Sequence, residues 1–136
     1  MIRALETSQS ALVAQRVRMD VIAGNIANAS TTRQADGTPL PYRRRFASFV
    51  EGATHDAPGV RVDVVGEDES PFQLKYDPGH PDAIQAGPNR GYVQFPNVNV
   101  TMEYVDALAA GRAYEANVAM LNLSRQMIQR SLRLFA

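Results

Sequence analysis

The sequence contains no cysteine and no tryptophan, and it has no surplus of charge of either sign. Without cysteine the chain cannot form a disulfide, a thiolate zinc site or a cysteine nucleophile. A protein that binds a nucleic-acid backbone needs a basic surplus to neutralise phosphates, whereas 14 basic and 14 acidic residues here give a net charge of zero. We therefore expect no nucleic-acid partner.

Long apolar runs are also missing. No stretch of about 18 consecutive apolar residues occurs, so we expect no membrane-spanning segment. A cleaved secretory signal needs an unbroken apolar stretch, and Glu6, Gln9 and Gln15 interrupt the first 20 residues. If the protein leaves the cytoplasm, we expect that it does so without a cleaved signal peptide.

Residues 2–28 have the spacing of an amphipathic helix. Apolar side chains recur every seven residues, at Leu5, Leu12, Met19 and Ile26, and no proline occurs before Pro39. A repeat of seven favours a left-handed supercoil with a partner helix. This pattern predicts a helix roughly 40 Å long.

Residues 101–136 predict a second, longer helix. Two rows of side chains recur every seven residues, at Tyr114, Leu121, Ile128 and Phe135, and at Ala113, Met120, Met127 and Leu134. Val118 and Leu132 broaden the stripe. Because the apolar residues cover more than one face, a single partner helix cannot cover them all. We expect neighbouring subunits to cover the remainder.

The middle of the chain, residues 29–100, has a different pattern. Seven of the eight prolines lie between Gly37 and Gly91. Apolar and polar residues alternate at 60–65 and 72–76, more weakly at 42–50 and 92–95, with turn sequences between them. Alternation of this kind predicts short strands. We expect a small Pro/Gly-rich antiparallel β element with long loops.

The predicted fold class is α+β, with the two terminal helices paired as an antiparallel coiled coil. Residues 1–28 and 101–136 would form an axial assembly domain, and residues 29–100 a loop-rich connector. The predicted assembly interface is Leu5, Leu12, Met19, Ile26, Tyr114, Val118, Leu121, Ile128, Leu132 and Phe135. A buried polar residue in a helical seam can fix register, and the candidates for register or capping are Asn25, Asn28 and Asn117.

The search for chemistry predicts no catalytic, cofactor-binding or metal site. His55 and Asp56 are adjacent in a loop, where a solvated pair is more common than a base and its orienting acid. Asp77 and His80 flank a Pro-Gly turn, where a structural turn contact is more common than a general base. No spacing of the HExxH type and no phosphate-binding loop occurs. The basic run 43–45 and the acidic run 67–69 suggest charge pairing between subunits.

Five segments together resemble one family. They are RMDVIAGNIANASTT at 18–32, DGTPLPYRRRF at 36–46, YDPGHPDA at 76–83, GYVQFPNVN at 91–99 and RAYEANVAMLN at 112–122. The first resembles flagellar axial proteins of the rod/hook family in general, and the others resemble the proximal rod proteins of the bacterial flagellar basal body (FlgC type). Gly111 departs from that pattern, and residues 47–58 resemble nothing in it.

The resemblance implies a structural subunit of the basal-body rod that is not an enzyme and needs no cofactor. Such proteins polymerise through their terminal helices into the drive shaft, which transmits torque across the periplasm and encloses the export channel. The implied partners are copies of the chain, neighbouring rod proteins and the flagellar type III export apparatus, which exports them without cleavage.

Three alternatives stay open at the level of sequence. The first is a different axial protein, from the rod or the hook junction. The second is a small acid–base enzyme that uses His80 and Asp77. The third is a freestanding coiled-coil adaptor, which would fold as a stable dimer in isolation.

Overall fold

Along the chain, a long helix is followed by four short strands and then by a second long helix. The computed structural model describes residues 2–52 and 58–135, with only the backbone of Ile2 and of Phe135. The elements are α1 (Ile2–Ala27), β1 (Arg45–Glu51), β2 (Val60–Glu67), β3 (Gln73–Tyr76), β4 (Tyr92–Phe95) and α2 (Val100–Phe135). The α+β class is confirmed, and both helices lie within one residue of the predicted bounds.

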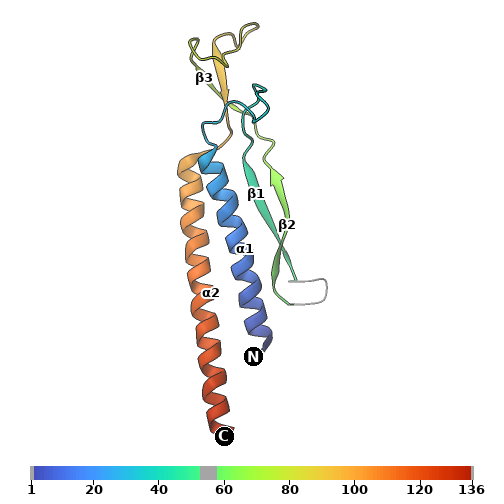
Figure 1. The fold of residues 1–136 in the computed structure, drawn as a ribbon, viewed down its shortest axis with the longest axis vertical. Helices are drawn as coiled ribbons and strands as arrows, with labels where there is room; N and C mark the ends of the chain where they lie inside the picture. The colour runs from blue at the N-terminus through green and yellow to red at the C-terminus, as the bar shows by residue number, and fades with distance from the viewer. Residues whose placement is uncertain (1, 53–57, 136) are drawn as a thin grey trace.

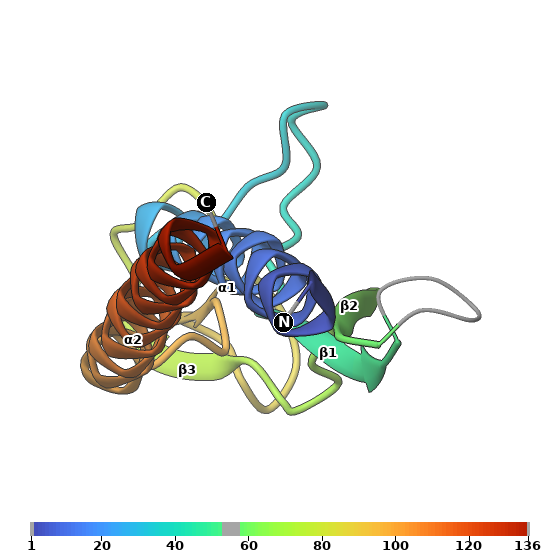
Figure 2. The ribbon, with the colours of Figure 1, turned by 90° about the horizontal axis from the view of Figure 1, so that it is seen from below.

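Helix α1 lies in the middle of the molecule. It runs beside α2 in the opposite direction (Figure 1), and seen from below it separates α2 from the β1–β2 pair (Figure 2). Arg18 of α1 lies 3.5 Å from Asp106 of α2, and Asn25 lies 3.1 Å from Glu103. Among the described elements, α2 packs only against α1. One helix is thus covered on two sides, and the other on one.

Helix α2 is the longer of the two, with 36 residues against 26 in α1. Counting along both helices from the bonded pairs Asn25–Glu103 and Arg18–Asp106 places Ile2 roughly opposite residue 124. Residues 126–135 therefore extend past the start of α1, as the positions of the two termini in Figure 1 show. We call residues 126–135 the overhang.

The strands form two separate antiparallel pairs rather than one β element. Strands β1 and β2 pair with a bulge between Ser48 and Phe49, and they lie along α1, where the Ser10 hydroxyl accepts a hydrogen bond from the Val60 amide at 3.1 Å. Strands β3 and β4 pair with each other beyond the end of the helices where α1 ends and α2 begins (Figure 1). The pairs are separate because one packs on a helix side and the other lies past the helix ends.

The described core is small and divided in the same way. We call the β3–β4 pair and its flanking loops, residues 68–99, the head. The buried apolar residues are Ala14, Ile22 and Ala110 along the helices and Ala83, Val93 and Val98 in the head. Alanine at positions 14 and 110 lets neighbouring elements approach closely. The larger apolar side chains of α2 are mostly exposed, so the helices bury little apolar surface within the chain.

Candidate assembly site

Asn25 is the most completely bonded side chain at the junction of α1, β1 and α2. It is fully buried, and its Nδ2 donates to the Arg45 carbonyl at 2.8 Å and to Glu103 Oε2 at 3.1 Å. Its Oδ1 accepts the Arg45 amide at 2.9 Å and the Tyr42 hydroxyl at 3.0 Å. An asparagine amide offers two donors and two acceptor lone pairs, so every one is used. Asn25 thereby ties three elements together.

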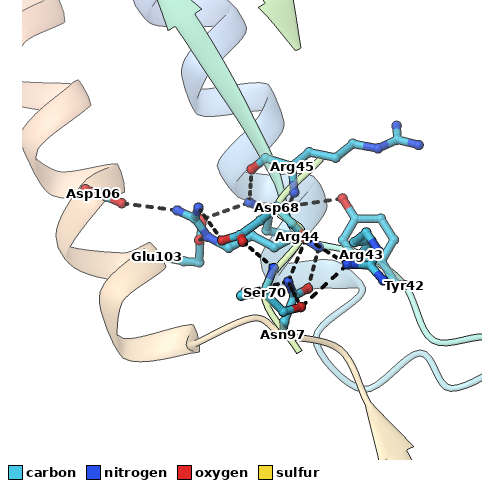
Figure 3. A network of polar contacts seen from close by, with 10 residues as sticks. Tyr42, Arg43, Arg44, Arg45, Asp68, Ser70, Asn97, Glu103 and Asp106 are labelled. Carbon is cyan, nitrogen blue, oxygen red and sulfur yellow. Dashed lines mark hydrogen bonds and ion pairs between the residues drawn. The ribbon is translucent and has the colours of Figure 1, made fainter. Parts of the chain in front are cut away.

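Glu103 and Arg44 form the charged part of the same network (Figure 3). Glu103 is 1% exposed, and Arg44 Nε donates to its Oε1 at 2.6 Å. The Arg44 guanidinium also lies 3.6 Å from Asp68 and 3.8 Å from Asp106. A buried carboxylate is tolerated when it is paired and hydrogen-bonded. Arg44 therefore links the start of β1 to α2 and to the segment after β2.

The basic and acidic runs contact each other within the chain, and their pairing between subunits stays a prediction. The register of β1 and β2 places Arg45 opposite Glu67, and the two side chains lie 3.7 Å apart. Arg44 pairs with Asp68, and Arg43 Nη1 donates to the Asp68 carbonyl at 3.1 Å. The two runs fasten the open end of the β1–β2 pair.

Asn97 completes the network from the strand side. Its Oδ1 accepts the Arg44 amide at 2.8 Å, and its Nδ2 donates to the Asp68 carbonyl at 2.9 Å and to the Ser70 carbonyl at 3.2 Å. The Ser70 amide donates to the Asp68 carboxylate, which lowers the pKa of Asp68. Burial raises the pKa of Tyr42. The bond from Ser70 thus favours the ionised form of Asp68, and burial favours the protonated form of the Tyr42 hydroxyl.

The other two asparagines singled out in the sequence bond only within or beside their own helix. Asn28 Nδ2 donates to the Gly24 carbonyl at 2.9 Å, which also accepts the Asn28 amide at 3.1 Å. Asn117 Nδ2 donates to the Ala113 carbonyl at 2.8 Å. A role for any of the three asparagines in setting register stays a prediction.

Most residues of the predicted interface lie on the faces that α1 and α2 turn towards the rest of the chain. Eight of them are half-buried: Leu5, Leu12, Met19, Ile26, Tyr114, Val118, Leu121 and Ile128. Tyr114, Leu121 and Ile128 continue the face of Glu103, which bonds to α1. Leu132 is 64% exposed, and the side chain of Phe135 lies outside the described residues. Their contacts with other subunits stay a prediction.

A second apolar row on α2 is exposed. We call it the outer row, and its members are Met102, Val105, Ala109, Ala116, Met120, Leu123, Met127 and Leu134. The six larger side chains are between 51% and 85% exposed. The heptad pattern had indicated Met120, Met127 and Leu134, but not Met102, Val105 or Leu123, which steps of three and four residues would have found. Arg112 and Arg130 interrupt this row, but exposed apolar side chains gathered along one helix face mark an interaction surface.

The residues considered for catalysis hold loops together. His80 Nδ1 accepts the Asp82 amide at 3.1 Å, and the His80 amide donates to the Asp77 carbonyl at 3.2 Å. The Asp82 carboxylate accepts the Thr32 hydroxyl at 2.9 Å and the Arg33 guanidinium, and these contacts lower the pKa of Asp82. His55 and Asp56 lie outside the described residues.

Two further classes of site are absent from the described part of the chain. No group of three potential metal-ligating side chains occurs in residues 2–52 and 58–135. Neither described helix has the length and apolar character needed to cross a bilayer.

Two family models match the ends of the chain. "Flagella basal body rod protein" matches residues 5–33, and "Flagellar basal body rod FlgEFG protein C-terminal" matches residues 89–134. Together they include most of α1, the β4 strand and nearly all of α2.

Curated relatives match nearly the whole chain, and each is called "Flagellar basal-body rod protein FlgC". The relative from Borreliella burgdorferi is 44% identical, covering 94% of this chain and 93% of its own. The relative from Bacillus subtilis is 41% identical, covering 96% and 95%. The relative from Salmonella typhimurium is 41% identical, covering 92% and 90%. A different axial protein is thus not favoured. The chain belongs to the FlgC family of flagellar basal-body rod proteins, and it is therefore a structural rod subunit and not an enzyme.

Proposed function

We propose that the chain polymerises through its terminal helices with copies of itself and with neighbouring rod proteins. The product is the part of the drive shaft that transmits torque across the periplasm and encloses the export channel. The observation that carries the proposal is the outer row of α2, an exposed apolar surface along a helix that packs against only one other described element. Membership of the FlgC family supports the place in the rod.

The α1–α2 pair is proposed to be an antiparallel coiled coil. From Glu103, positions 107, 110, 114, 117, 121, 124 and 128 follow at alternate steps of four and three, and all are buried or half-buried. This is the spacing of a heptad seam. Ala107 and Ala110 at the start of the seam keep the helix axes close there. Residues 1–28 and 101–136 would thus be the assembly domain, with residues 29–100 as the connector.

The outer row is turned away from this seam. Adjacent residues of a helix point roughly 100° apart, so Met120 lies about a quarter-turn from Leu121 of the seam. Burying one Leu or Met side chain contributes roughly 1.5–3 kcal/mol, so a row of this length can hold a neighbouring helix. Three of the five methionines lie in it, Met102, Met120 and Met127. Flexible thioether side chains adapt to different partners, which suits a shaft built from several proteins.

Export is proposed to follow the route of the family, through the flagellar type III apparatus and without cleavage of the chain. Two features of the sequence support this proposal. The first 20 residues carry polar side chains where a cleaved signal would be apolar. The absence of cysteine suits a chain that passes into an oxidising compartment.

The test places charge on the outer row. The variant Leu123→Asp with Met127→Asp should fold like the unchanged chain, because both side chains are already more than half exposed. It should be missing from isolated basal bodies, and cells that carry it should not swim, since burying two unpaired carboxylates against a neighbour is costly.

The matched control is Ala119→Asp with Asn122→Asp, at exposed positions of the same helix outside both the outer row and the overhang. These cells should swim, and circular dichroism should show equal helix content in both variants. Normal incorporation of the Leu123 and Met127 variant into basal bodies would refute the outer row as an assembly surface.

A further inference from the structure

A groove runs between α1 and β2 on the side of α1 away from α2. Its apolar lining includes Val13 and Val17 of α1 and Val60 and Val62 of β2, and its volume is about 510 Å³. Val13 is 61% exposed. Val17, Val60 and Val62 are half-buried. Partly accessible valines along a helix and a strand form a surface suited to a further apolar element.

The charges around the groove are mostly acidic. Glu6 and Arg61 belong to its lining, and Glu51 of β1 pairs directly with the lining residue Val60. Asp63 lies 3.7 Å from Arg61 and offsets its charge. The lining itself therefore holds one acid and one base, and two further acids, Glu51 and Asp63, lie beside it.

The overhang of α2 has complementary properties. Leu132 and Leu134 are 64% and 85% exposed. From residue 116 to residue 136 the chain has no acidic residue, and Arg130 and Arg133 lie within the overhang. Its ten residues span roughly 15 Å, and the groove follows α1 from Glu6 to Val17, roughly 17 Å. Length, apolar character and charge all match the groove.

We propose that the overhang of one copy docks in the α1–β2 groove of a second copy. The inference rests on the proposed function, because it specifies one contact within the assembly. A chain cannot fill its own groove. Val13 lies opposite residue 113 or so, which leaves roughly 28 Å along the helix axis to Leu132.

The positions of the two surfaces determine the kind of assembly. Strand β2, which lines the groove, and helix α2 lie on opposite sides of α1 (Figure 2), so the contact joins unlike surfaces and repeats from copy to copy. When two copies lie parallel and the middle of one copy's overhang lies beside the middle of the other's groove, the two copies are displaced from each other by roughly 24 Å along the helix axis. A contact between unlike surfaces with an axial shift builds an open helical array rather than a closed ring.

Disulfide cross-linking tests the contact without interference, because the chain has no cysteine of its own. The double variant Val13→Cys with Leu132→Cys replaces the native chain in flagellated cells, and basal bodies are isolated and mildly oxidised. We expect a ladder of covalent multimers on a gel without reductant and its loss with reductant. The control is Val64→Cys with Leu132→Cys, because Val64 is 54% exposed but does not line the groove.

Each outcome decides one point. A ladder from the Val13 variant and none from the control supports the contact. Basal bodies that contain the Val13 variant without a ladder overturn it and leave the proposed function standing, and a different rod protein in the groove would give this result. Equal ladders from both variants also overturn it. Absence of the unchanged chain from basal bodies would instead contradict the proposed function.

A second measurement applies if the double variant does not enter basal bodies. Purified chains with Val13→Cys alone and Leu132→Cys alone are mixed at high concentration and oxidised. The covalent heterodimer should exceed that from Val64→Cys mixed with Leu132→Cys. Equal yields would overturn the groove contact.

Discussion

The two ends of the helix pair are built in opposite ways. At the junction with the strands, Asn25 and Glu103 are buried and bonded to partners from the same chain. At the other end, Leu132 and Leu134 are exposed and α1 no longer runs alongside. One end is complete within the chain, whereas the other leaves apolar surface uncovered.

The difference shows what each kind of interaction contributes. A buried polar atom must meet its partner at a defined distance and angle, so the junction fixes how α1, β1 and α2 lie relative to one another. Apolar burial has no direction and accepts partners of different shape. A subunit that must join non-identical neighbours therefore benefits from polar contacts inside and apolar contacts outside.

The largest expected effect comes from removing the centre of the junction. Asn25→Ala removes the partner of Glu103 Oε2, of the Tyr42 hydroxyl and of the Arg45 amide, and should lower the free energy of unfolding by about 3–5 kcal/mol. Urea unfolding followed by circular dichroism measures it. Asn122→Ala, at an exposed position of α2, should change it by less than about 0.5 kcal/mol. Equal effects of the two variants would mean that the junction does not stabilise the chain.

A smaller change in the free energy of unfolding, of opposite sign, is expected at Gly111, which lies between the two ends of the helix pair. A Cβ built there meets no atom within 4 Å, so no close contact in the chain requires glycine. Gly111→Ala should raise the free energy of unfolding by roughly 0.5–1 kcal/mol, because alanine is the better helix former. Thermal unfolding checks the sign. A lower melting temperature would show that this part of α2 is more crowded than the structure indicates.

The smallest effect concerns pH and the head. The Arg33 guanidinium and the Thr32 hydroxyl hold the pKa of Asp82 below its ordinary value of 3.8. The unfolded chain then takes up the proton at higher pH than the folded chain, so this contribution to stability is present above pH 3.8 and is lost as the pH falls through the lower, folded-state pKa. Asp82→Asn should flatten this part of the pH profile of urea unfolding. Identical profiles for the two proteins would rule out Asp82 as a contributor.

Sequence alone predicted the helices and the strands because their patterns are local. The heptad at Leu5, Leu12 and Met19 and the alternation in residues 60–65 are visible in a short window. Which strands pair is not local, and the single expected β element became two. The charged runs at 43–45 and 67–69 were visible, but only the register of β1 and β2 shows that they pair within the chain.

The junction could not be predicted because its bonds join distant residues. Asn25 bonds to Arg45, 20 residues away, and to Glu103, 78 residues away. Nothing near Asn25 in the sequence distinguishes it from Asn28, which bonds locally to Gly24. The groove also depends on two distant segments, since Val13 and Val60 meet only when the β1–β2 pair lies on α1.

The junction also has a mechanical consequence. The bonds Asn25–Glu103, Arg44–Glu103 and Arg18–Asp106 all join α2 to the rest of the chain within its first two turns. A force that displaces α2 strains them together rather than one after another. The helix pair is therefore held rigidly at one end, and the stiffness of its other end depends on the neighbour that binds the overhang.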